Sequence, residues 1–196
     1  PQAQGFWKKQ RLMHGVEAEW DKDNGKYKLY PDFGKQMSGD DVGVWYTFDT
    51  SANEQIEVSV GVSFVSVENA RLNLSTEQPE GSDFDALRTS ASAAWNDMLG
   101  RIKVEGGTDV QTTVFYTALY HTLIHPNILQ DVNGEYPAME SHKILRTTGN
   151  RYTVFSLWDT YRNLHQLMTL IYPERQIEMV RSMVDMSKEW GWLPKW

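Results

Sequence analysis

The chain has 196 residues, of which 40% are hydrophobic and 23% are charged, so it can form a packed core and is not a disordered segment. A formal net charge of −7, without a basic stripe among the aromatic residues, argues against nucleic acid as a partner. The absence of cysteine excludes disulfides and thiolate metal sites, and no apolar run reaches the roughly 18 residues of a membrane-spanning helix.

The first 75 residues predict β structure. Apolar residues alternate with polar or small ones in VGVWYTFD (42–49) and in QIEVSVGVSF (55–64), the pattern of a strand with one buried face. Asp23-Asn24-Gly25 predicts a hairpin turn, because Asn-Gly supplies the positive φ that a tight turn requires. Short strands at this spacing are typical of an antiparallel β-sandwich.

From about Ser82 the apolar spacing becomes helical. Ser82 is a candidate N-cap for a helix that continues to Ile102. Thr108 and Gln111 form a capping-box pattern that opens a second helix, and Pro126 ends that helix or follows it closely.

Residues 127–151 are polar and turn-rich and predict a long loop. A third helix is expected from about Leu157 to Ile171, and a fourth from Pro173, with Gly191 as its C-terminal cap. Strands followed by helices, without βαβ alternation, indicate separate β and α domains. So few helices cannot close a helical barrel, so we expect the chain to be an excerpt of a longer protein.

Three side chains near the start of the third predicted helix are candidate binding groups. Asp159 and Arg162 are three residues apart and share a helix face, beside the indole of Trp158. An aromatic plane beside a carboxylate and a guanidinium suits a sugar, which offers an apolar face for stacking and hydroxyls for hydrogen bonds. The alternatives are a local surface ion pair and core packing of Trp158, although the apolar FSLWDTYR context predicts buried charges that need partners.

The segment GWLPKW, after the fourth predicted helix, supplies the remaining candidates Trp192, Lys195 and Trp196. Loops held by a rigid scaffold often carry binding groups, and a hydrophobic helix cap is the alternative. His121 and His125 have the spacing of a zinc pair, but HTLIH lacks the metalloprotease Glu, so packing or capping is favoured. We also expect a structural role for His165.

Several of these segments resemble one known family. They are FSLWDTYR, LMTLIYPE, MVRSMV and GWLPKW in the C-terminal part, with GVSFVSVENARLNL (61–74), AWNDMLGRIKVEGG (94–107) and FYTALYHTLIHPN (115–127) upstream. In this order they closely resemble the calcium-dependent exo-acting α-mannosidases of glycoside hydrolase family 92. The resemblance covers about two thirds of the chain.

The resemblance implies an α+β multidomain fragment. Residues 1–75 would belong to an antiparallel β-sandwich, residues 76–107 to a helical linker, and residues 108–196 to the first helices of an (α/α)6-barrel catalytic domain. It implies that Trp158, Asp159, Arg162, Trp192, Lys195 and Trp196 bind substrate. The catalytic acid and base, and most ligands of the Ca²⁺ cofactor, would lie outside the fragment, which alone would be inactive.

By the same resemblance the activity is exo-acting, inverting removal of terminal mannose from glycans, as in N-glycan degradation, in the periplasm, at the cell surface or in the medium. Two alternatives remain open: a non-catalytic carbohydrate-binding module, and a different (α/α)6-barrel glycosidase. More helical segments beyond Trp196, carrying a Glu and an Asp-rich loop, would favour the mannosidase. The oligomeric state, the linkage specificity and any signal peptide or lipid anchor cannot be deduced from the sequence.

Overall fold

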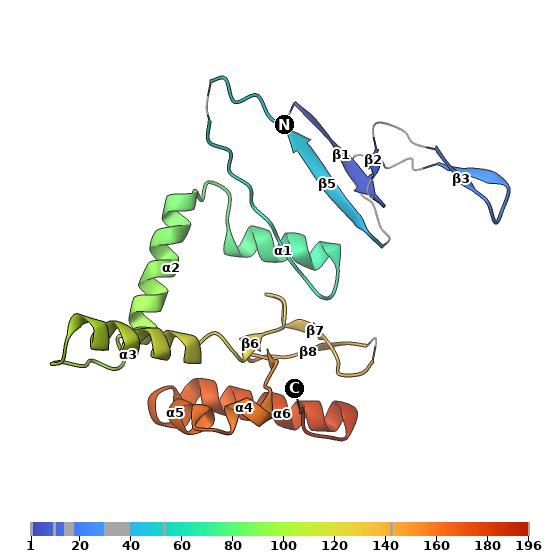
Figure 1. Cartoon of the computed structure of the whole chain (residues 1–196). Coiled ribbons are helices and arrows are strands. Elements are labelled where there is room, and N and C mark those ends of the chain that lie inside the picture. Colours follow the sequence, from blue (N-terminus) through green and yellow to red (C-terminus); the bar gives the residue numbers. More distant parts are fainter. Residues whose placement is uncertain are drawn as a thin grey trace. The chain divides into compact units, whose positions relative to one another are not determined.

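In the computed structural model, the described residues are 2–9, 11–13, 18–29, 40–52, 54–141 and 143–195. They belong to two compact units, Pro1–Glu57 and Val58–Trp196. The described residues combine small antiparallel sheets with six helices, a mixed α and β fold (Figure 1). Among them, no helix is both long and apolar enough to cross a membrane.

The first unit contains a three-stranded antiparallel sheet and a separate hairpin. The sheet has the order β2-β1-β5 and consists of β1 (Ala3–Lys8), β2 (Arg11–Met13) and β5 (Val42–Thr47). The hairpin pairs β3 (Ala18–Asp21) with β4 (Lys26–Leu29). Both the strand predicted in 42–49 and the turn around Asn24-Gly25 are confirmed. The Asp21 carboxylate accepts hydrogen bonds from the Asp23 and Asn24 N–H groups at 3.0 and 3.2 Å, so it stabilises the turn.

The strand predicted at 55–64 is wrong. In the described part of the chain this segment forms no strand, and its alternate apolar side chains face solvent, with Val58 72% and Phe64 71% exposed. No described strand pairs with it, so its alternating pattern has no sheet on which to pack. At Gly61 the segment passes very close to the next helix, because an added Cβ would lie 2.2 Å from the Ala70 carbonyl oxygen.

Three helices open the second unit (Figure 1). Helix α1 (Val67–Glu77) occupies residues predicted to be β, and Ser66 caps it by accepting from the Asn69 N–H at 3.0 Å. Helix α2 spans Phe84–Leu99 and is capped by Asp83 rather than the expected Ser82, because the Asp83 carboxylate accepts from the Ala86 N–H at 2.7 Å. Helix α3 (Asp109–Thr122) begins with the predicted Thr108–Gln111 capping box.

The region predicted to be a loop, 127–151, instead contains short strands. They are β6 (Asn127–Ile128), β7 (Glu135–Pro137) and β8 (Ile144–Arg146), with β9 (Tyr152–Thr153) just after the region. β6 pairs with β9, and β7 pairs with β8. Strands of two or three residues are too short for an alternating pattern to be seen among the surrounding turn residues.

A buried carboxylate in the turn before β7 forms hydrogen bonds with α1 and with the residues before it. Asp131 is only 4% exposed and accepts hydrogen bonds from Ser63 Oγ, Asn69 Nδ2 and Asn73 Nδ2 at 2.6, 2.8 and 2.7 Å. The Val132 N–H donates to Asn73 Oδ1 at 3.0 Å. These bonds satisfy a polar group that would otherwise be costly to bury.

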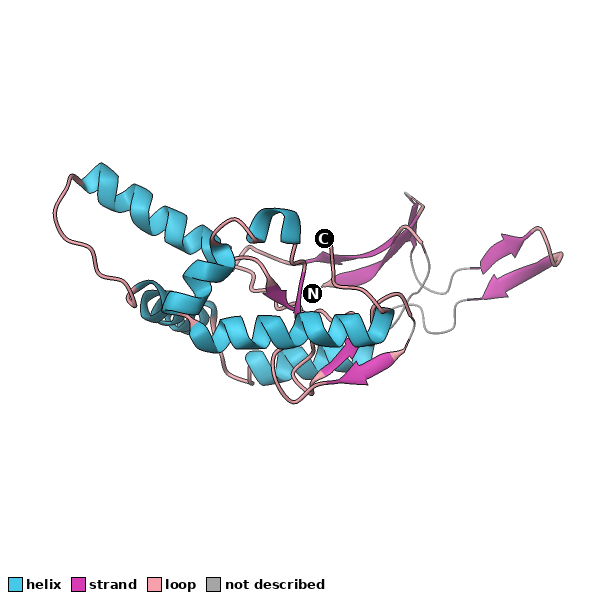
Figure 2. Cartoon of the chain, turned by 90° about the horizontal axis from the view of Figure 1, so that it is seen from below, coloured by secondary structure: helices cyan, strands magenta, loops and turns pink. Residues whose placement is uncertain are grey.

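The predicted third helix is interrupted. It consists of α4 (Leu157–Thr160) and α5 (Leu164–Ile171), separated by Asn163 with a φ of 75°. Helix α6 (Pro173–Trp190) confirms the fourth, with Pro173 in its first turn and Gly191 at its C-terminus with a φ of 91°. Helices α5 and α6 lie side by side (Figures 1 and 2).

Two apolar clusters hold the second unit together. The first joins α3 to α5 and contains Leu119, Leu123, Met168 and Tyr172. The second lies between β9, the residues after it and α6, and contains Tyr152, Phe155, Met179 and Met186. The second cluster supports both segments that carry the predicted binding residues.

Candidate functional site

The first predicted segment presents its indole to solvent. Trp158 lies on the short helix α4 and is 64% exposed. The segment turns at Ser156, whose φ is 41°, and the Ser156 hydroxyl donates to the Asp159 carboxylate. Phe155 is fully buried just before this turn, so one side of the segment anchors it and the other is available to a ligand.

Asp159 and Arg162 are exposed, which contradicts the expectation of buried charges. Among the described residues no ion pair joins them, and the Arg162 guanidinium lies 5.3 Å from the centre of the Tyr161 ring. The apolar residues that suggested burial divide between the two sides of the segment: Phe155 points inward, whereas Trp158 and Tyr161 are exposed. The carboxylate and the guanidinium are therefore both accessible to a ligand, while Asp159 also accepts the hydrogen bond from Ser156.

The second predicted segment follows α6 directly. Gly191 ends the helix in the left-handed conformation, and Trp192 is 72% exposed. Pro194 is buried and Lys195 is exposed. Trp196 lies outside the described residues.

One backbone hydrogen bond brings the two segments together. The N–H group of Leu157 donates to the carbonyl oxygen of Lys195 at 3.1 Å. Trp158 is next to the donor in the chain and Pro194 is next to the acceptor. The structure thus places the two segments side by side, whereas the sequence only suggested each of them separately.

Behind these segments lies a buried ion pair that the sequence did not reveal. Arg151 Nη2 lies 2.9 Å from Glu189 Oε2, and the two side chains are only 2% and 10% exposed. Glu189 also accepts from the Tyr136 hydroxyl at 2.9 Å and from the Met139 N–H at 3.1 Å. Arg151 Nη1 donates to the Ser182 carbonyl oxygen at 2.9 Å, and the guanidinium lies 4.8 Å from the centre of the Tyr136 ring. Its partners are distant in sequence, so no spacing could have identified the pair.

Burial raises the pKa of Tyr136 to about 12, and the hydrogen bond to the Glu189 carboxylate and its negative charge add to the rise. Both effects disfavour the phenolate, which would be desolvated and repelled by the neighbouring anion. Tyr136 therefore remains a hydrogen-bond donor to Glu189 at physiological pH.

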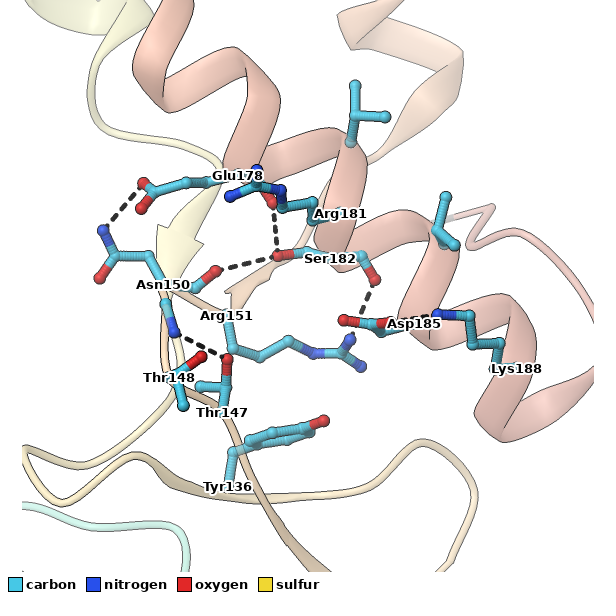
Figure 3. A pocket seen from close by; sticks show the side chains of 13 residues that line it. Tyr136, Thr147, Thr148, Asn150, Arg151, Glu178, Arg181, Ser182, Asp185 and Lys188 are labelled. Atoms are coloured by element: carbon cyan, nitrogen blue, oxygen red, sulfur yellow. Dashed lines mark hydrogen bonds and ion pairs between the residues drawn. The ribbon is translucent and has the colours of Figure 1, made fainter.

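A polar groove of about 700 Å³ runs along α6 on the side of this ion pair (Figure 3). Its lining includes Tyr136, Thr147, Thr148 and Arg151. Asn150 Nδ2 donates to Glu178 Oε2 at 2.9 Å across the groove. The groove offers both donors and acceptors, but it does not contain the predicted binding residues.

The three histidines among the described residues each contact a neighbouring side chain. His125 Nδ1 lies 3.1 Å from Asn127 Oδ1, and the His121 ring lies 5.4 Å from the ring of Tyr120. His165 Nδ1 and Nε2 lie 3.1 and 2.9 Å from Gln176 Oε1 and Thr160 Oγ1, which confirms its structural role. Across the described ranges, no three His, Asp or Glu side chains are arranged to hold a metal ion.

The two segments therefore present exposed indoles together with an exposed carboxylate and exposed cationic side chains. The sequence suggested those residues by their types, and their role stays a prediction; it did not suggest Arg151, Glu189 or Tyr136. The only local signal for them was a pair of charged residues, Arg151 and Glu189, each at the edge of an apolar aromatic run.

Comparisons with known proteins agree on one family. Residues 69–196 match the glycosyl hydrolase family 92 catalytic domain. A protein of the fungus Arthroderma benhamiae described as an uncharacterized secreted glycosidase is 32% identical over 126 residues, which cover 62% of this chain and 15% of the fungal protein.

Solved structures give the same result. The family GH92 inverting mannosidase BT2199 of Bacteroides thetaiotaomicron is 26% identical with a TM-score of 0.73, over 98% of this chain and 24% of that protein. The α-mannosidase BT3965 of the same species is 28% identical with a TM-score of 0.63, over 95% of this chain and 24% of that protein. The chain thus spans a quarter or less of the length of these relatives, and it belongs to glycosyl hydrolase family 92.

Proposed function

We propose that the protein containing this chain is an exo-acting α-mannosidase that removes terminal mannose from glycans with inversion at the anomeric carbon. The observation that carries the proposal is the Leu157–Lys195 backbone hydrogen bond, because it joins two exposed aromatic and charged segments into one surface. Family membership supports hydrolysis of a glycosidic bond, and the similar solved structures are described as mannosidases.

In this proposal Trp158 and Trp192 stack on the apolar face of the mannose ring. Aromatic planes suit this role because they bury C–H groups without competing for the hydroxyls. Asp159 accepts hydrogen bonds from sugar hydroxyls, while Arg162 and Lys195 donate to sugar oxygens. These residues orient the ring, and Trp196 would extend the same wall.

Inverting hydrolysis uses a general acid and a general base about 6.5–9.5 Å apart, with a water molecule on the face of the ring opposite the leaving group. We propose that both carboxyl groups, and the ligands of a Ca²⁺ ion, come from residues outside these 196. Bound Ca²⁺ would supply a hard Lewis acid toward sugar hydroxyls. The role of the present chain is binding and orientation.

The proposed arrangement assigns residues 1–75 to a β-sandwich, 76–107 to a helical linker and 108–196 to the first part of an (α/α)6 barrel. We further propose export, in line with the description of the fungal relative as secreted.

The test is release of mannose from an α-1,2-linked mannobiose by the full natural polypeptide, with Ca²⁺ and then with EDTA. The proposal predicts Ca²⁺-dependent release with an inverted anomer, detected by NMR during the first turnovers. Binding of the disaccharide without release would instead support a carbohydrate-binding module, and release of glucose from glucosides alone would support a different glycosidase.

A further inference from the structure

We infer that the buried Arg151–Glu189 pair is a clamp that positions the sugar-binding surface, an inference that rests on the proposed function. Neither residue reaches that surface. Each acts through the segment that follows it, so they are positioning residues and not catalytic ones.

The inference rests on two contacts between the same two segments, the ion pair and the backbone hydrogen bond. Arg151 lies six residues before Leu157, and Glu189 lies six residues before Lys195. The first residues of the two segments are joined by the 2.9 Å ion pair, and the last by the 3.1 Å backbone hydrogen bond. Segments 151–157 and 189–195 are therefore fixed to each other at both ends.

The first segment is also packed against α6 next to the ion pair. Tyr152 and Phe155, from the first segment, are 2% and 0% exposed and pack against Met186 of α6. The Tyr152 N–H donates to Ser182 Oγ at 2.9 Å, one more link between the first segment and α6. A densely packed interior transmits a displacement instead of absorbing it.

The exposed indoles on and next to these segments have fewer side-chain contacts than the buried residues. Trp192 is 72% exposed and Trp158 is 64% exposed, so the contacts of their own side chains do little to fix them. Their positions depend on the backbone, which the clamp holds.

The two charged side chains make several polar contacts, although Nε of Arg151 is buried without a hydrogen-bond partner. Glu189 accepts from Arg151, from the Tyr136 hydroxyl and from the Met139 N–H, and Arg151 Nη1 donates to the Ser182 carbonyl oxygen. Loss of either charge leaves the other buried without its counterion, a state that the segments relieve by moving apart.

The experiment labels the full natural polypeptide with 5-fluorotryptophan and follows ¹⁹F NMR. Trp158→Phe and Trp192→Phe assign the two surface resonances. Glu189→Gln removes the charge with little change in shape, and Arg151→Lys keeps the charge but loses the fork that contacts two oxygens. Asp85→Asn is the matched control, because Asp85 forms an exposed ion pair with Arg88 on α2.

We expect both clamp variants to shift or broaden the Trp158 and Trp192 resonances, while Trp20 and Trp45 in the first unit and all resonances of Asp85→Asn stay unchanged. In steady-state kinetics on mannobiose, we expect KM to rise about ten- to hundredfold with a smaller change in kcat. A displacement of about 1 Å at a binding group can change kinetic constants by about this factor. Arg151→Lys keeps the inference testable if Glu189→Gln does not fold.

Unchanged Trp158 and Trp192 resonances in a folded clamp variant would overturn the inference, and so would a fall in kcat with KM unchanged. If the wild-type protein releases no mannose, the proposed function fails, but the resonances still decide the clamp: a shift supports it and no shift overturns it.

Discussion

The Nε2 atom of His165 lies 2.9 Å from the hydroxyl oxygen of Thr160, across the interruption between α4 and α5. The other ring nitrogen, Nδ1, lies 3.1 Å from Oε1 of Gln176 on α6. Both hydrogen bonds form when Nδ1 carries the ring proton. Nδ1 then donates to Gln176, and Nε2 accepts from the buried Thr160 hydroxyl. One imidazole thus links the segment that carries Asp159 and Arg162 to helix α6.

We expect His165→Ala to destabilise the protein by about 1–3 kcal/mol, because it leaves the buried Thr160 hydroxyl without this partner. It should also lower kcat/KM for mannobiose, since Asp159 and Arg162 lose their support. Urea denaturation and steady-state kinetics test both effects. His125→Ala is the control, because His125 pairs only with the nearby Asn127 in an exposed position and should change neither quantity much. Equal effects of the two substitutions would contradict the prediction.

Removal of the exposed indole of Trp158 should impair binding and leave folding intact. We expect Trp158→Ala to lower kcat/KM about ten- to hundredfold, equivalent to about 1.4–2.7 kcal/mol, and to shift the free energy of unfolding only slightly. Trp158→Phe should recover part of the loss because it restores an aromatic plane.

The matched control for Trp158 is Phe84→Ala. Phe84 on α2 is 65% exposed, against 64% for Trp158, and lies outside the proposed site. Kinetics with mannobiose that are unchanged in Trp158→Ala would remove this residue from the sugar site.

The end of α6 depends on the backbone of Gly191. With a φ of 91° this position suits glycine, although an added Cβ would meet no atom within 4 Å. We therefore expect Gly191→Ala to cost about 1 kcal/mol through backbone strain alone, measured by urea denaturation. Gly191→Asn should cost less, because asparagine tolerates the left-handed region. Equal stability of the alanine variant and the wild type would refute this account.

The local signals in the sequence predicted the elements that local interactions determine. The Thr108–Gln111 box, the Pro173 start and the Gly191 end of α6 are each set by neighbours within a few residues, and all three were confirmed. The interruption between α4 and α5 was not predicted, because Asn163 adopts a φ of 75° inside a segment whose apolar pattern is helical. Its apolar spacing is that of a continuous helix.

Features that depend on distant partners could not be predicted. The pattern at 55–64 is that of a strand, but pairing requires a neighbour, and the described strands provide none. Arg151 and Glu189 are 38 residues apart and meet only after β9 packs on α6. Trp158 and Trp192 were predicted to bind sugar from their residue types alone, and that role stays a prediction. The contact between their segments is a backbone hydrogen bond that no side chain encodes.

The raised pKa of Tyr136 predicts a loss of stability in alkali. Its pKa is about 12 in the folded protein and 10.0 ordinarily. Below pH 10 the phenol is protonated in both states, so its contribution to stability is fully present. Between about pH 10 and 12 the unfolded chain releases this proton and the folded protein retains it, so the free energy of unfolding falls as pH rises, by at most about 1.4 kcal/mol per pH unit for one proton.

Tyr136→Phe removes the titrating hydroxyl and so shows how much of the pH dependence comes from Tyr136. At pH 8 the variant should be less stable by about 1 kcal/mol, because Glu189 loses one donor. From pH 10 to 12 its stability should fall less steeply than that of the wild type, and the two curves should converge or cross. Burial also raises the pKa values of Tyr152 and Tyr172, so a residual slope remains in the variant. Urea denaturation at intervals from pH 8 to 12 measures the difference in slope. Parallel curves would show that folding does not raise the pKa of Tyr136, whereas convergence would show that burial and the neighbouring Glu189 carboxylate together keep the phenol protonated in the folded protein.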